Sequence, residues 1–181
     1  MTSLAPRDPP PPGAAALTEG FYRELHDLAL RAFAAEKSGH TLQPTAVVHE
    51  ACVRMLSSSP LPDVPRSERL ALAARVMRQV LVDHHRARNA DKRGGGALRL
   101  ELDPELADGA GATADFAAVH AALERLRALH ARQAEVVTLK VFGGLTMEEV
   151  ALSLAVSKRT VEDDWAVARA WLRRALAGAW A

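Results

Sequence analysis

The stretch TMEEVALSLAVSKRTVEDDWAVARAWL, residues 146–172, decides the fold of this chain. Thr146 is followed three residues later by Glu149, which is the pattern of a capping box, where each side chain accepts a hydrogen bond from the other residue's backbone N–H. Ser157 is suited to cap a second helix. Residues 154–156 leave room only for a short turn between the two. The stretch therefore predicts two helices joined by a tight turn.

The second of these helices has one apolar arc. At about 100° per residue, the arc contains Val161, Trp165, Ala168, Leu172 and Leu176. This arc predicts a core-facing seam, and it leaves the opposite face free for a DNA major groove. The candidate DNA-binding residues on this helix are Ser157, Lys158, Arg159, Thr160 and Arg169. The alternative interpretation is an ordinary, well-capped helical hairpin.

Acidic residues share the exposed face of this helix. Glu162 and Asp163 stand there with Arg159, and Asp164 follows. Residues 146–177 contain five basic and five acidic groups, so their net charge is zero. Carboxylates repel phosphates, although a carboxylate can accept a hydrogen bond from the cytosine amine in the major groove.

Composition predicts an all-α protein. The 181 residues include 36 Ala and 24 Leu, no Ile, and 19 Arg against 4 Lys. Helix formers dominate, and strand-favouring residues are scarce. A single cysteine, Cys52, excludes an internal disulfide and fits a reducing compartment. The sequence has no signal pattern and no apolar run near the ~18 residues that would span a bilayer, so we expect a cytoplasmic protein without a membrane partner.

Breaks in the sequence predict two small helical domains joined by a flexible linker. Residues 1–20 contain five prolines and are expected to form a disordered tail. Residues 94–115 begin with three glycines and predict an acidic linker. The helical domains are then residues 21–93 and residues 116–177. The first carries a net charge of +4, which is compatible with a polyanion-binding surface.

A helix over residues 68–93 is predicted to carry part of that charge. Arg75, Arg86 and Arg93 fall within about 20° of one another on a helical wheel. Arg78 and Asn89 flank them, and the opposite side is apolar. A basic stripe of this length can follow a phosphate backbone, so these five residues are candidates for DNA binding. The alternative is a solvated charged face.

Several ordered stretches resemble one protein family. They are residues 39–51, 72–84, 92–96, 132–137, 142–149 and 165–172. Together they resemble the ECF-like group of bacterial RNA polymerase sigma factors, from about residue 21 to residue 177. The C-terminal helix-turn-helix predicted above falls inside this resemblance.

The resemblance implies a function and partners. The first domain would dock on the clamp helices of the largest polymerase subunit and would recognise and melt the minus-ten element. The helix after Ser157 would read the minus-thirty-five element, and the linker would thread toward the active-site channel. The implied partners are core RNA polymerase and promoter DNA, with no catalysis by this chain and no cofactor. The docking candidates are Thr45, Val48, His49 and Glu50.

The resemblance also implies a switch at Thr45. In other sigma factors the docking helix starts with acidic residues, but the matching residues 43–46 contain no carboxylate. Some sigma factors that lack this acidic patch are similar in having a threonine that a Ser/Thr protein kinase phosphorylates. A phosphate there adds about −1.5 to −2 charges near a helix N-terminus, which favours negative charge. The alternative is that Thr45 is simply a first-turn threonine.

Other candidate sites and functions are less well supported by the sequence. His120 and Glu124 have metal-ligand spacing, but no third ligand is suitably placed, so no metal site is predicted. No catalytic constellation has convincing context. Two alternatives to a sigma factor remain: a stand-alone helix-turn-helix regulator, and a degenerate sigma-like interaction module. The exposed acids, and the absence of the aromatic residues that the family usually has before Ala73, favour the module.

Overall fold

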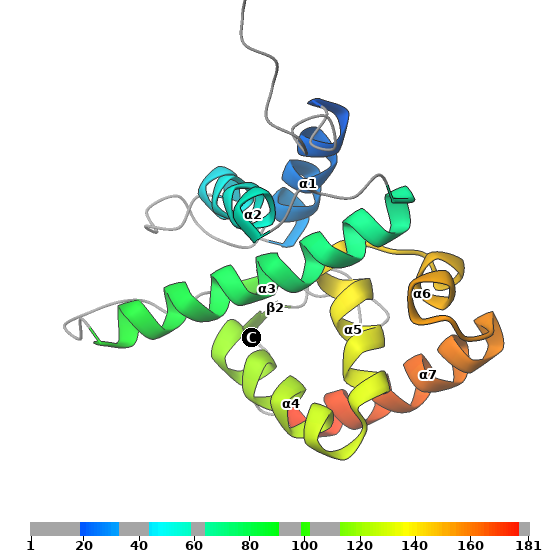
Figure 1. Cartoon of the computed structure of the whole chain (residues 1–181). Helices are drawn as coiled ribbons and strands as arrows, with labels where there is room; N and C mark the ends of the chain where they lie inside the picture. Colours follow the sequence, from blue (N-terminus) through cyan, green and yellow to red (C-terminus); the bar gives the residue numbers. More distant parts are fainter. Residues whose placement is uncertain (1–18, 33–43, 59–63, 91–98, 102–112, 178–181) are drawn as a thin grey trace, which may run out of the picture.

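The computed structural model describes residues 19–32, 44–58, 64–90, 99–101 and 113–177. This part of the chain forms helices and two short strands (Figure 1). They are α1 (Glu19–Ala32), α2 (Pro44–Ser58), α3 (Arg66–Ala90), β1 (Arg99–Glu101), β2 (Thr113–Asp115), α4 (Phe116–Leu129), α5 (Ala131–Gly143), α6 (Met147–Leu154) and α7 (Lys158–Ala175). The predicted all-α fold class is confirmed, because each strand has only three residues. None of the described helices is both long and apolar enough to cross a lipid bilayer.

Helix α3 runs through the middle of the molecule. Figure 1 shows α1 and α2 on one side of it and the helices α4–α7 on the other. Its buried apolar residues therefore occur on several faces: Leu70, Ala71, Ala73, Ala74, Met77, Val80, Leu81 and Val82. The alanines among them have no long side chains, so neighbouring helices approach α3 closely. This differs from the amphipathic helix with a basic stripe opposite one apolar side that the sequence predicts.

The first three helices form a compact group, which we call the N-terminal unit. Helix α2 begins at Pro44, where proline is favoured because it lacks the backbone N–H that the first helical turn does not use. Phe21 and Leu25, four residues apart on α1, are both buried. Of the predicted proline-rich tail, only Glu19 and Gly20 belong to the described residues, where they start α1. The rest of the tail lies outside them.

Helices α4–α7 form a second group, which we call the C-terminal unit. Asp115 caps α4 by accepting a hydrogen bond from the Ala117 N–H at 3.2 Å. Helix α5 returns against α4 and is followed by its C-cap residue Gly144, whose φ of 61° lies in the left-handed region that glycine adopts without strain. Helix α7 then packs across α4, α5 and α6.

The two units pack directly against each other. Helix α5 lies against α3 and α1, and α6 also contacts α3. A Cβ placed on Gly143 would lie 2.9 Å from the Ala74 Cβ, which shows how closely α5 approaches α3. The buried residues of both units belong to one hydrophobic core. The domain boundaries given above, at 93/94 and 115/116, stay a prediction.

Each end of the predicted linker contains a short β-strand that was not predicted from the sequence. Strands β1 and β2 pair in antiparallel register, with Leu100 opposite Ala114, and both of these side chains are buried. Strand β1 also lies against α1. A three-residue strand is too short to show the alternation of apolar and polar residues that identifies strands in a sequence.

Candidate nucleic-acid interface

Helices α6 and α7, joined by a tight turn, occupy the stretch for which a helix-turn-helix is predicted. The Thr146 hydroxyl accepts from the Glu149 N–H at 3.2 Å, and the Glu149 carboxylate accepts from the Thr146 N–H at 2.9 Å. Ala155 makes the turn in the left-handed conformation, with φ of 52°. Ser157 then caps α7 by accepting from the Thr160 N–H at 3.1 Å. The two caps and the turn predicted from the sequence are therefore present.

The predicted apolar seam of α7 faces the hydrophobic core. That seam is buried and consists of Val161, Trp165, Ala168, Leu172 and Leu176. On the other side, Ser157, Lys158 and Arg159 are exposed at the N-terminal end of α7, while Thr160 and Arg169 are half-buried. The end of α7 that would enter a groove therefore presents a short row of polar and basic side chains.

Ion pairs with neighbouring carboxylates reduce the free positive charge of this end. The Lys158 Nζ lies 2.5 Å from Glu148 and 3.6 Å from Glu162. The hydrogen bond with Glu148 raises the pKa of the Lys158 ammonium. The third acid of the run, Asp164, points inward instead and binds the Arg132 guanidinium at 2.5 Å. Two acids, Glu162 and Asp163, are thus left exposed beside Arg159.

The predicted basic stripe on α3 is divided between solvent and the C-terminal unit. Arg75 is exposed, but its Nε donates to Glu135 of α5 at 2.5 Å. Arg78 is buried, with 8% of its surface exposed, and binds Glu124 of α4. Arg86 is exposed. The structure places Asn89 in the last turn of α3 without describing its side chain, and Arg93 lies outside the described residues.

Helix α2 holds the predicted docking residues. Thr45 and His49 are exposed, whereas the Val48 side chain is fully buried in the core. Glu50 is half-buried and binds Arg54 at 2.5 Å and the His84 Nε2 at 3.0 Å. Of these four residues, Thr45 and His49 therefore offer most surface to a partner.

The solvent-facing side of α2, which we call its outer face, also carries apolar side chains that were not predicted to be exposed. Val53 and Leu56 are 53% and 42% exposed. They follow His49 at the i+4 and i+7 positions, so the three share one face of α2. This spacing was visible in the sequence, but which face of α2 is covered depends on the packing of α1 and α3.

Thr45 borders a small hollow beside α1. Its hydroxyl lies 3.2 Å from the His26 Nε2. Tyr22, Arg23 and Asp27 complete the lining. Two side chains that can carry positive charge, Arg23 and His26, thus lie near the start of α2, whose first turn contains no acidic residue.

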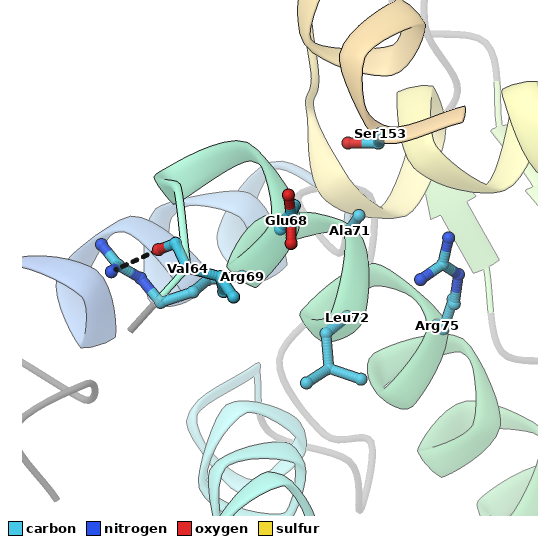
Figure 2. A pocket seen from close by; sticks show the side chains of 7 residues that line it. All are labelled: Val64, Glu68, Arg69, Ala71, Leu72, Arg75 and Ser153. Atoms are coloured by element: carbon cyan, nitrogen blue, oxygen red, sulfur yellow. Dashed lines mark hydrogen bonds between the residues drawn. The ribbon is translucent and has the colours of Figure 1, made fainter. Parts of the chain in front are cut away.

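A cavity of about 260 Å³ lies between the start of α3 and α6 (Figure 2). Its lining is formed by Val64, Glu68, Arg69, Ala71, Leu72, Arg75 and Ser153. The guanidinium of Arg69 donates to the Val64 carbonyl at 3.1 Å and lies over the Phe21 ring. Of the predicted site residues, only Arg75 reaches this cavity.

Metal binding has no support among the described residues, where no three His, Cys, Asp or Glu side chains gather. His120 and Glu124, which have the right spacing for two ligands, instead both contact Arg78. Burial, and next the charge of Arg78, lower the pKa of His120. Cys52 is buried, and burial raises the pKa of its thiol.

Comparison with known proteins identifies the family. The family model described as ECF sigma factor matches residues 11–178, which is nearly the whole chain. No curated protein and no solved structure matches the chain significantly. The family match covers both units and the helix-turn-helix described above. The chain therefore belongs to the ECF sigma factor family and serves in transcription initiation together with RNA polymerase.

Proposed function

We propose that this chain directs core RNA polymerase to specific promoters in the cytoplasm, with the N-terminal unit docking on the polymerase and α7 reading the minus-thirty-five element. The observation that supports this most is the capped helix-turn-helix, whose exposed residues Ser157, Lys158 and Arg159 lie at the end of α7 that enters the groove in such motifs. The family match supports the partnership with polymerase and promoter DNA.

The outer face of α2 is the proposed docking surface. His49, Val53 and Leu56 form an exposed row on it, and Thr45 stands at its start. Exposed apolar side chains in a row are typical of protein-binding surfaces. Val48 is buried in the core beneath this surface, so it does not contact the partner.

We further propose that a Ser/Thr protein kinase gates docking by phosphorylating Thr45. Three observations support the gate: Thr45 is exposed, it lies in the first turn of α2, and that turn lacks a carboxylate. A phosphate at a helix N-terminus is favoured by the unpaired N–H groups and by the helix dipole. Arginines of the polymerase would then pair with the phosphate.

The test measures co-elution with core RNA polymerase in gel filtration. The proteins compared are the unmodified chain, the chain with phosphothreonine at position 45, and Thr45→Glu. Ala128→Glu is the matched control, because it adds the same charge to an exposed position of α4, away from the proposed docking surface on α2. Co-elution of the phosphorylated chain alone supports the gate. Co-elution of the unmodified chain supports docking and refutes the gate, while failure of every form refutes the polymerase partnership.

One observation favours a second function. The outer face of α7 carries Glu162 and Asp163, and Lys158 is paired with carboxylates. A sigma-like module that binds polymerase without opening promoters would fit this weakly basic face. Transcription from a promoter library with the reconstituted holoenzyme separates the two functions, since such a module yields no promoter-dependent transcript.

A further inference from the structure

One row of side chains on α7 lies on the side away from the core. At about 100° per residue, Asp163 lies about 180° from the middle of the buried seam of α7. Arg159 and Val167 stand one turn before it and one turn after it, and all three side chains are exposed. We call Arg159, Asp163 and Val167 the outer row of α7. In a helix-turn-helix, this side of the second helix faces the major groove.

The outward direction of Asp163 is fixed by its neighbour in the sequence. Asp164 is buried, and its carboxylate binds the Arg132 guanidinium of α5 at 2.5 Å. Adjacent helical positions differ by about 100°, so a helix that turns Asp164 inward holds Asp163 outward. The Ser157 cap fixes the start of the same helix. Asp163 therefore stands on a rigid element, as residues that read a ligand precisely require.

The two exposed acids of α7 differ in their partners. The Glu162 carboxylate lies 3.6 Å from the Lys158 Nζ, which also binds Glu148 of α6 at 2.5 Å. Asp163 has neither an ion pair nor a side-chain hydrogen bond with any residue that the structure describes. Its carboxylate is thus the free hydrogen-bond acceptor in the middle of the outer row.

A free carboxylate at this place can be matched by few base edges. An ionised carboxylate only accepts hydrogen bonds. In the major groove, guanine presents two acceptors and thymine presents an acceptor and a methyl group, so neither has a donor for it. Adenine presents a donor beside an acceptor, whereas cytosine presents its N4 amine alone. The Asp163 carboxylate is therefore best matched by cytosine.

The surroundings of Asp163 reduce its repulsion from the DNA backbone. Phosphates line the edges of the groove, whereas the middle of the outer row faces the base edges on its floor. Ala166 and Ala170 are exposed on the same side of α7, and their short side chains let the helix approach that floor closely. Arg159, one turn before Asp163, adds a positive charge that attracts the phosphates.

We propose that Asp163 is the residue of α7 that specifies a cytosine in the minus-thirty-five element. The inference rests on the proposed function, because it takes α7 to enter the major groove of that element. It also assigns a role to the acidic residue on this helix. A carboxylate that weakens binding to most base pairs and is matched by one of them raises specificity at the expense of general affinity.

The test uses holoenzyme reconstituted from core RNA polymerase and the full-length chain, in whichever form co-elutes with the polymerase, unmodified or phosphorylated at Thr45. It transcribes a promoter library that is randomised in both elements and carries a barcode in each transcript, so sequencing gives the base preference at each position. Asp163→Asn keeps the side-chain shape and adds an amide donor, which suits adenine. Glu162→Gln is the matched control, because it removes the same charge from the neighbouring, paired position.

The wild-type chain should select cytosine at one position of the minus-thirty-five element. The expected preference is about 5-fold to about 150-fold over the other bases, which is the range that one mismatched base pair typically costs. Asp163→Asn should lose this preference and favour adenine at the same position, while the other positions keep theirs. Glu162→Gln should retain the cytosine. Circular dichroism verifies that both variants fold as the wild type does.

Three outcomes overturn the inference. They are a wild-type chain that selects no cytosine in this element, an unchanged cytosine preference in Asp163→Asn, and an equal loss of that preference in Glu162→Gln. The last would show that net charge, rather than the Asp163 carboxylate, sets the preference. Failure of the proposed function is seen separately, because then no form co-elutes with the polymerase or no promoter-dependent transcript appears with the wild type or either variant.

Discussion

Replacing Gly143 by valine should push the two units apart. A Cβ at this position would lie 2.9 Å from the Ala74 Cβ of α3 and 2.5 Å from the Leu145 Cδ1. The Leu145 methyl is the end of a flexible side chain and can move, but Ala74 is fixed to the backbone of α3. Helix α5 must therefore retreat from α3, and the further methyl groups of valine increase the required movement.

The expected loss of folding stability is the overpacking cost less the gain in helix propensity. Overpacking a close contact costs up to about 3 kcal/mol, and valine recovers about 0.5 kcal/mol in helix propensity relative to glycine. The net loss of about 2.5 kcal/mol corresponds to a fall in Tm of about 5–10 °C for a protein of this size. Thermal unfolding followed by circular dichroism measures it.

Ala128→Val is the matched control, because Ala128 is exposed on α4 and gains the same side chain without a close neighbour. Its loss in helix propensity is about 0.5 kcal/mol, or about 1–2 °C. If Gly143→Val melts within the range of this control, α5 does not lie against α3 as described.

Three smaller perturbations test the local structure by thermal and denaturant unfolding. Ser157→Ala removes the cap of α7 and should cost about 1 kcal/mol, and an unchanged midpoint would contradict the cap. Ala155→Gly relieves about 1–2 kcal/mol of left-handed strain but adds about 0.4–1 kcal/mol of chain entropy, so it should be stabilising, and a loss of stability would count against the φ of 52°. His120 has a lowered pKa, so the unfolded state takes up its proton first as the pH falls below about 6.5, and the folded state loses stability in that window. His120→Gln should flatten this part of the pH profile relative to wild type, and an identical slope would refute the contribution of His120.

Local features of the helix-turn-helix were predictable from the sequence. Thr146, Glu149 and Ser157 act within one helical turn, so the spacing of residue types is sufficient to specify their hydrogen bonds. The seam of α7 was predictable for the same reason, since period and residue type alone give its direction. The left-handed Ala155 was anticipated only as a turn position.

Features that depend on pairs of distant residues were not predictable. Arg78 was assigned to a surface from its helical spacing and Val48 from the family resemblance, but α4 covers the first and the core of the N-terminal unit contains the second. Arg75 meets Glu135 across 60 positions of sequence. No periodicity within one helix encodes such a contact, because it depends on how two helices pack.

The charge distribution over the two units indicates how affinity and specificity are divided. On α7, Lys158 is held by Glu148 and Glu162, and in the described part of the chain Arg159 alone of the first-turn cations has no ion pair. A helix end with so little free positive charge gains little from phosphates, so under the proposed function we expect α7 to contribute mainly through contacts to base edges.

In the arrangement that the structure shows, α4 covers Arg78 and Glu135 pairs with Arg75, whereas Arg86 and the N-terminal end of α7 are exposed. Positive charge that is paired within the chain adds little to phosphate binding, so among the residues proposed to contact DNA we expect Arg86 and Arg159 to meet a phosphate backbone more readily than Arg75 and Arg78.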